Sequence, residues 1–119
     1  MADDSDGYTL IEVLIVSIVI GLLAVIAVPI ILHHRERAWQ GAVDSDLRNA
    51  AIEFESAAKV NGGQYPVALP ASVAMSPDVA LTVGAAASPS RICLKGNHYG
   101  LATTTYYDSA AGGLTSTVC

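Results

Sequence analysis

The feature that most constrains the fold is an apolar run from Val13 to Leu32, which holds 20 residues without a charge. Ser17, Gly21 and Pro29 are its only interruptions. A helix of about 20 apolar residues is long enough to cross a hydrocarbon core about 30 Å thick. We therefore expect this run to form a helix that can cross a membrane, followed by a smaller domain.

One carboxylate, Glu12, lies directly before this run, inside an apolar stretch that already begins at Tyr8. A carboxylate that is buried without a partner costs several kcal/mol or more, and ionisable residues in membrane segments are functional by default. The residues leave two interpretations open. Glu12 reaches the membrane surface from one turn inside the stretch, or it pairs with a group of opposite charge.

Composition limits the rest of the chain to one modest domain. The chain has 119 residues, 52% of them apolar and 14% charged, and about 87 follow Leu32. So small a core often needs a covalent staple. The net charge is −5, and no basic stripe interleaved with aromatic residues indicates nucleic-acid binding. Asp3, Asp4 and Asp6 lie in the first seven residues, so without these residues the net charge would be −2.

The order of residues 7–12, Gly-Tyr-Thr-Leu-Ile-Glu, with Gly21 and Pro29 further along, resembles the N-terminus of type IV pilins and related pseudopilins. The resemblance implies that a prepilin peptidase cuts between Gly7 and Tyr8 and that the new amine of Tyr8 is methylated. It also implies that Glu12 pairs with the amine of a neighbouring subunit during assembly. Such a pair would neutralise two costly charges and set the register of added subunits.

The resemblance divides the chain into four parts. Residues 1–7 are the leader, residues 8–32 the transmembrane and assembly helix, residues 33–61 an amphipathic helix, and residues 62–119 a β-rich head. Gly21 and Pro29 weaken the first helix, because glycine is a poor helix former and proline removes a hydrogen bond. In pilin filaments the corresponding stretch is often extended, which implies that it unwinds on assembly. A bent membrane helix is the alternative.

Two other interpretations of the apolar run are a secretory signal peptide and an ordinary single-span anchor. The acidic start, the length of the run and the lack of a clean cleavage site disfavour the signal peptide.

Charge alone predicts an outside N-terminus, because acids precede the span and the basic cluster His33–Arg37 follows it. The acidic leader also departs from the basic leaders that are common in pilins. We nevertheless expect a cytoplasmic N-terminus, since cysteines and a strand-rich head suit an oxidising exterior.

The basic cluster itself is expected to be a solvated collar where the helix leaves the membrane. Adjacent histidines point to different sides of a helix, and neither His33 nor His34 has a partner at zinc spacing. No metal site is therefore predicted there.

An amphipathic pattern follows, and with residues 8–32 it predicts one helix of about 54 residues, roughly 80 Å long if straight. Its apolar stripe consists of Trp39, Val43, Leu47, Ala50, Ala51, Phe54, Ala57 and Ala58, with Arg48, Glu55 and Lys59 opposite. Asp46 and Glu53 lie at the margin, where we expect rim positions, with contacts to a neighbouring subunit as the alternative. Gly62 and Gly63 are expected to end the helix.

The remainder is expected to form a small antiparallel sheet on the amphipathic helix, which makes the fold class α+β. The resemblance implies that this is a pilin fold. One strand is predicted around residues 80–85 in a proline-containing connector, and two more at 90–95 and 99–107. Gly96 and Asn97 between them are a two-residue hairpin signal. A turn at 108–113 and a last strand at 114–118 complete the sheet.

Cys93 and Cys119 are the only two cysteines, so they can pair in one way. Many type IV pilins have a C-terminal disulfide-bounded region, and this pair resembles it. A bridge of this loop length would stabilise the fold by about 3 to 4 kcal/mol in the chain-entropy model. Two free thiols in a reducing compartment are the alternative.

Sequence signals of catalysis are absent: no nucleophile elbow, glycine-rich phosphate loop, CxxC or HExxH is found. His98 is expected to be solvated in a turn. Asp108 with Ser109 suggests a calcium loop or, more simply, an Asx turn. No enzyme activity, cofactor or metal is expected.

The predicted function is that of a structural pilin subunit, first a single-pass protein of the cytoplasmic membrane and later part of a surface filament. Expected partners are further copies of the chain, the prepilin peptidase, and the assembly platform with its ATPase. The alternatives are a pseudopilin of a type II secretion or DNA-uptake system and a monomeric membrane-anchored binding module.

Overall fold

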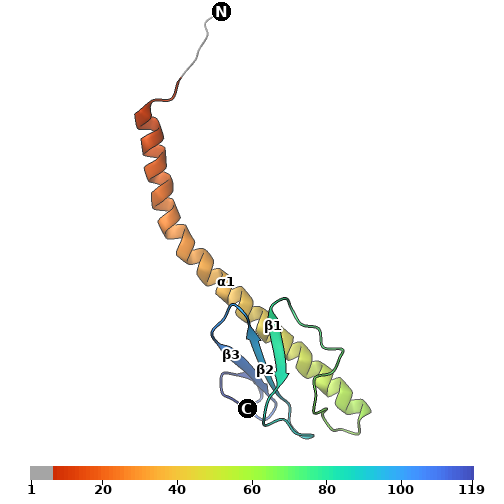
Figure 1. Cartoon of the computed structure of the whole chain (residues 1–119). Helices are drawn as coiled ribbons and strands as arrows, with labels where there is room; N and C mark the ends of the chain where they lie inside the picture. The colour runs from red at the N-terminus through yellow and green to blue at the C-terminus, as the bar shows by residue number, and fades with distance from the viewer. Residues whose placement is uncertain (1–6) are drawn as a thin grey trace, which may run out of the picture. The chain divides into compact units, whose positions relative to one another are not determined.

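The computed structural model describes residues 7–119, so most of the predicted leader lies outside the described residues. A helix, α1 (Leu10–Val60), is followed by four strands (Figure 1). These are β1 (Val79–Val83), β2 (Cys93–His98), β3 (Thr104–Asp108) and β4 (Gly113–Thr115). The predicted α+β class, one long helix with a small antiparallel sheet, is confirmed. The chain divides into two compact units, Met1–Arg35 and Glu36–Cys119, and we call the second unit the head.

The helix has close to its predicted bounds. It begins at Leu10 and ends at Val60, and it continues through both Gly21 and Pro29. Gly62 and Gly63 have φ angles of 67° and 86°, in the left-handed region that glycine adopts without strain. The Gly63 N–H donates to the Ala58 carbonyl at 2.7 Å, as in the closing bond of a Schellman motif. The predicted glycine stop is thus confirmed.

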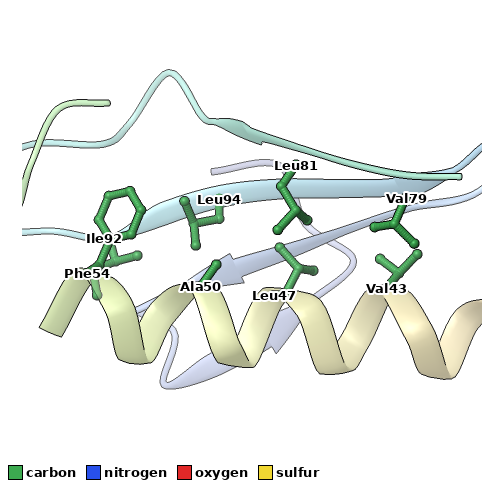
Figure 2. Close-up of a cluster of buried hydrophobic side chains, with 8 residues drawn as sticks. All are labelled: Val43, Leu47, Ala50, Phe54, Val79, Leu81, Ile92 and Leu94. Carbon is green, nitrogen blue, oxygen red and sulfur yellow. The ribbon is translucent and has the colours of Figure 1, made fainter. Parts of the chain in front are cut away.

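The core of the head lies between α1 and the sheet. Figure 2 shows side chains of α1 pointing toward side chains from β1, β2 and the residue before β2. The cluster consists of Val43, Leu47, Ala50, Phe54, Val79, Leu81, Ile92 and Leu94. The predicted apolar stripe is confirmed, with Trp39 and Ala57 half-buried and its other members buried, and the opposite charged residues are exposed.

The sheet is antiparallel throughout, in the order β1-β2-β3-β4. The predicted first strand and the predicted turn at 108–113 are confirmed. The predicted strands at 90–95 and 99–107 are displaced along the chain, since β2 begins at Cys93 and β3 at Thr104. The last strand, β4, ends earlier than expected, at Thr115.

The predicted hairpin turn at Gly96 and Asn97 is wrong, because both residues lie inside β2. A Cβ atom at position 96 would lie 3.0 Å from side-chain carbons of Leu47, Leu81 and Val43. Gly96 therefore lets β2 approach α1 closely, and it is not a turn residue. The chain reverses at residues 99–103 instead.

The expectation of a solvated His98 is also wrong. His98 is buried at the end of β2, and its ring stacks on Trp39 with centroids 4.7 Å apart and planes 17° apart. Its Nδ1 accepts a hydrogen bond from the Gly100 N–H at 2.9 Å. The residue is therefore part of the packing between α1 and the β2–β3 loop.

Asp46 is buried, not on the rim as predicted. Its carboxylate accepts hydrogen bonds from the Ser76 N–H at 2.6 Å and from the Ser76 hydroxyl at 3.0 Å. Glu53 is half-buried and accepts a hydrogen bond from the Ser72 hydroxyl at 2.6 Å. Both carboxylates hold the connector that leads from α1 to β1, because its polar groups have few strand partners of their own.

The predicted disulfide is present. Cys93 and Cys119, 26 residues apart in sequence, are bonded with Cα atoms 5.8 Å apart. Cys93 is fully buried, so the bridge fixes the end of the chain to the beginning of β2. The C-terminal residue is further held by the Ala86 N–H, which donates to its carbonyl at 3.3 Å.

Candidate functional site

The candidate site lies at the N-terminus of α1, where Glu12 occupies the first turn. Thr9 directly precedes the helix, and its N–H and its hydroxyl each donate to Glu12 Oε2 at 2.8 Å. In return the Glu12 N–H lies 3.4 Å from Thr9 Oγ1 and 3.1 Å from the Thr9 carbonyl oxygen. This reciprocal pattern is a capping box, which satisfies donors that the first turn of a helix leaves unpaired.

The capping box gives the Glu12 carboxylate two hydrogen-bond donors within its own chain. A carboxylate near the start of a helix is also favoured by the positive end of the helix dipole. Both effects lower the cost of a charge at the edge of an apolar segment. The negative charge is nevertheless not neutralised, because Thr9 offers only neutral donors.

The Gly7–Tyr8 peptide bond lies outside the helix, in a segment without regular secondary structure. Gly7 is exposed, and among the described residues beyond its chain neighbours no atom lies within 4 Å of the position that a Cβ would occupy there. The Tyr8 side chain is 89% exposed. Four residues separate this bond from Glu12, so a new amine at Tyr8 would be created close to the first turn of α1.

The segment after Glu12 presents an uncovered apolar surface. Every residue from Val13 to Leu32 is exposed, and α1 is the one helix in residues 7–119 that is long and apolar enough to cross a membrane. The one hydroxyl in this stretch, on Ser17, donates to the Val13 carbonyl at 2.8 Å. The apolar surface therefore needs lipid or other protein chains to cover it.

The structure brings some of the predicted site residues together and leaves others apart. Glu12 lies in the first turn of α1, next to Thr9, whereas Gly21 and Pro29 lie further along the same helix. Thr9 as the partner of Glu12 was not predicted, although its signal, a Thr three residues before a Glu at a helix start, is present in the sequence.

The second polar cluster lies in the head, around Asp108. Arg91 Nε donates to Asp108 Oδ1 at 2.9 Å, and Arg91 Nη2 donates to Oδ2 at 2.6 Å. The Ala110 N–H donates to Asp108 Oδ1 at 2.9 Å, which forms the Asx turn. Hydrogen bonds from Arg91 hold the pKa of Asp108 below its ordinary value. No group of three metal-ligating side chains occurs within residues 7–119.

Comparison with known proteins adds evidence for the N-terminal segment. A search of curated proteins finds no match to the chain. The family described as the prokaryotic N-terminal methylation motif matches residues 4–28, which include the Gly7–Tyr8 bond, Glu12 and Gly21. This motif is the signature of type IV pilins and their prepilin precursors. The match to this motif, together with one long apolar helix and a small antiparallel sheet, indicates a type IV pilin-like or pseudopilin protein.

Proposed function

We propose that the chain is the structural subunit of a type IV pilus-like surface filament. It is made as a precursor in the cytoplasmic membrane with its N-terminus in the cytoplasm, and a prepilin peptidase cleaves it between Gly7 and Tyr8. The amine of Tyr8 is methylated, and the subunit polymerises through its N-terminal helix with the help of an assembly platform and ATPase. The observation that carries this proposal is the Glu12 carboxylate at the start of the apolar, exposed segment of α1, with four residues between it and the cleavage bond.

The chemistry of assembly follows from the charges. Cleavage would give Tyr8 a positive amine, which must enter the same apolar surroundings as Glu12. Each charge alone would be costly there, whereas a pair between neighbouring subunits neutralises both. Thr9 would hold the carboxylate until the amine of a neighbour arrives, because its two donors are already in place.

Gly21 and Pro29 have a proposed role in the same helix. Pro29 has no N–H for the carbonyl four residues earlier, and Gly21 adds backbone freedom. We propose that this stretch unwinds when the subunit enters a filament, although the helix is continuous in the isolated chain.

One alternative within the family is a pseudopilin of a type II secretion or DNA-uptake system. The disulfide that closes the C-terminal region of the head favours a pilin over a calcium-stabilised pseudopilin head. Asp108 supports the same choice, since Arg91 and the Asx turn already occupy its two oxygens.

Two substitutions separate the assembly role of Glu12 from its capping role. Glu12→Gln keeps an oxygen for the Thr9 donors, since glutamine also serves in a capping box, but it removes the charge. Thr9→Ala removes the capping hydroxyl and keeps the charge. We expect Glu12→Gln precursor to be cleaved and to stay in the membrane without filaments, whereas Thr9→Ala subunits still assemble.

The measurement is electron microscopy of material sheared from cells that express each variant, with immunoblots of the membrane fraction as the control for synthesis. Filaments of normal abundance from Glu12→Gln cells would contradict the pairing role. Loss of filaments from both variants at normal membrane levels would show that capping itself is required.

A further inference from the structure

The C-terminal end of α1 carries a reactive pair of residues. Val60 is the last helical residue, and Asn61, Gly62 and Gly63 follow it. Asparagine is chemically labile, and a glycine after it favours loss of the side-chain amide, because glycine has no Cβ to hinder its own nitrogen. Of the three asparagines in the chain, Asn61 is the one that precedes a glycine.

The groups that would react at this position are accessible. Asn61 and Gly62 are both exposed. The Asn61 N–H donates to the Ala57 carbonyl at 3.0 Å, and the Gly63 N–H donates to the Ala58 carbonyl at 2.7 Å. Between them, the Gly62 N–H donates no hydrogen bond within residues 7–119. The Gly62 nitrogen is therefore free to react.

The Asn61 side chain is held weakly. Its Nδ2 lies 3.5 Å from the Gln64 carbonyl oxygen, beyond the usual range of about 2.7 to 3.2 Å for such a bond. Gly62 has a φ of 67°, and beyond its chain neighbours no described atom lies within 4 Å of its Cβ position. Helix ends also fray at little cost in free energy. Rotation of exposed groups thus lets the Asn61 side chain reach the Gly62 nitrogen.

We propose that Asn61 deamidates spontaneously in the folded chain, so that the end of α1 is a modification site that needs water and no enzyme. The Gly62 nitrogen loses its proton to solvent and bonds to Asn61 Cγ. The Cγ–Nδ2 bond breaks, and the leaving nitrogen takes up a proton and departs as ammonia. The product is a succinimide ring.

Water then opens this ring at one of its two carbonyls. Hydrolysis at Cγ gives aspartate at position 61. Hydrolysis at the main-chain carbonyl gives isoaspartate, in which the chain continues through the former side chain. In sum, one water is consumed and one ammonia is released, with no change of oxidation state.

Both products alter the way in which α1 ends. Each adds a negative charge at the C-terminal end of the helix, where the helix dipole favours a positive one. Isoaspartate also adds a methylene group to the main chain, directly before the Gly63 N–H that bonds to Ala58 and closes the helix. The modification therefore weakens the cap as the protein ages. The inference does not depend on assembly into a filament.

Tandem mass spectrometry of the full chain, incubated in detergent and then digested, tests the site. Deamidation replaces an amide NH2 by OH and raises the mass of a peptide by about 1 Da. Asn49 inside α1 and Asn97 inside β2 are internal controls, because Ala50 and His98 follow them. We expect Asn61 to convert at least tenfold faster than either. Equal rates at the three asparagines would overturn the proposal.

The pH dependence tests the chemistry of the attack. Conversion of Asn61 should be faster at about pH 9 than at about pH 6, because the attacking nitrogen must lose its proton. A rate that does not rise with pH would contradict the ring-closing step.

A synthetic peptide of residues 57–66 gives the rate without the fold. We expect Asn61 in the full chain to convert within tenfold of the peptide rate, because the fold leaves the reacting groups accessible. A full chain that converts Asn61 more than tenfold more slowly would overturn the proposal, since the end of the helix would then protect it.

Asn61→Gln keeps an exposed side-chain amide but would have to close a larger ring. Asn49→Gln is the matched control, because it removes another exposed asparagine of the chain. A methyltransferase specific for isoaspartate supplies the readout, through incorporation of a labelled methyl group. We expect incorporation to fall at least tenfold in Asn61→Gln and to stay at the wild-type level in Asn49→Gln. Unchanged incorporation in Asn61→Gln would contradict the proposal.

Discussion

Among single residues, Gly96 shows how closely the sheet approaches α1. Three side chains of the core would lie 3.0 Å from a Cβ at this position, which is closer than ordinary van der Waals contact. Gly41 is a contrasting glycine of α1, because it is exposed and no atom lies within 4 Å of its Cβ position. The two glycines therefore have opposite expected responses to the same substitution.

Gly96→Ala is expected to lower the free energy of unfolding of the head by about 1 to 3 kcal/mol, because the core must move to accept a methyl group. Gly41→Ala is expected to raise it by up to about 1 kcal/mol, since alanine is the better helix former. Urea denaturation of the full chain in detergent, followed by Trp39 fluorescence, measures both. A Gly96→Ala variant as stable as the wild type would show that β2 does not approach α1 this closely.

Asp108 makes the stability of the head depend on pH. Its pKa lies below the ordinary value of 3.8, first because Arg91 donates hydrogen bonds to the charged form and then because the Ala110 N–H does so. The folded head therefore binds this proton more weakly than the unfolded chain. The stabilisation is complete above the ordinary pKa and is lost as the pH falls through the folded pKa.

Asp108→Asn is expected to make the loss of stability between about pH 6 and about pH 2 smaller than in the wild type, because the group that titrates is gone. Asp78→Asn, at an exposed carboxylate, is the matched control and should keep the wild-type profile. Thermal unfolding followed by circular dichroism across this pH range gives the comparison. Identical profiles for Asp108→Asn and the wild type would rule out this contribution.

Among the elements, the helix was predictable and the strand bounds were less so. The apolar stripe from Val43 to Ala58 repeats with the helical period, and two glycines end the helix, so local sequence determines most of α1. The hairpin turn predicted at Gly96 was wrong because glycine permits either a turn or a close approach between elements. Which of the two applies depends on the side chains of Val43 and Leu47, which are about 50 residues away in sequence.

The candidate site shows the same division between local and distant information. The motif around Gly7 and Glu12 is continuous in sequence, so its position could be predicted directly. The burial of His98 and Asp46 could not, because the partners of these side chains, Trp39 and Ser76, come from other elements. A single sequence contains no signal that joins such pairs.

The disulfide is expected to hold the last element in place. Replacing both Cys93 and Cys119 with alanine should lower the free energy of unfolding by about 3 to 4 kcal/mol in the chain-entropy model, since the loop spans 26 residues. Chemical denaturation of the oxidised wild type and of the double variant measures the difference. Reduced wild type should resemble the double variant, and equal stability of all three forms would contradict this role.

At the scale of the whole molecule, the two units differ in what covers their apolar residues. The head has its own core between α1 and the sheet, with a disulfide at its C-terminal end. Within residues 7–119 the apolar segment is not covered, and at its start Thr9 donates two hydrogen bonds to the Glu12 carboxylate. Lipid in the precursor and neighbouring subunits in a filament would each supply that cover, which is the basis of the proposed function.

The central claim is that processing at Gly7 converts a membrane-held precursor into a filament subunit. Tandem mass spectrometry of the N-terminal peptide, taken from filaments sheared off the cell surface, tests it most directly. The account predicts that the first residue is Tyr8 with a methylated amine. A chain that still begins at Met1 and is never recovered in sheared filaments would contradict it.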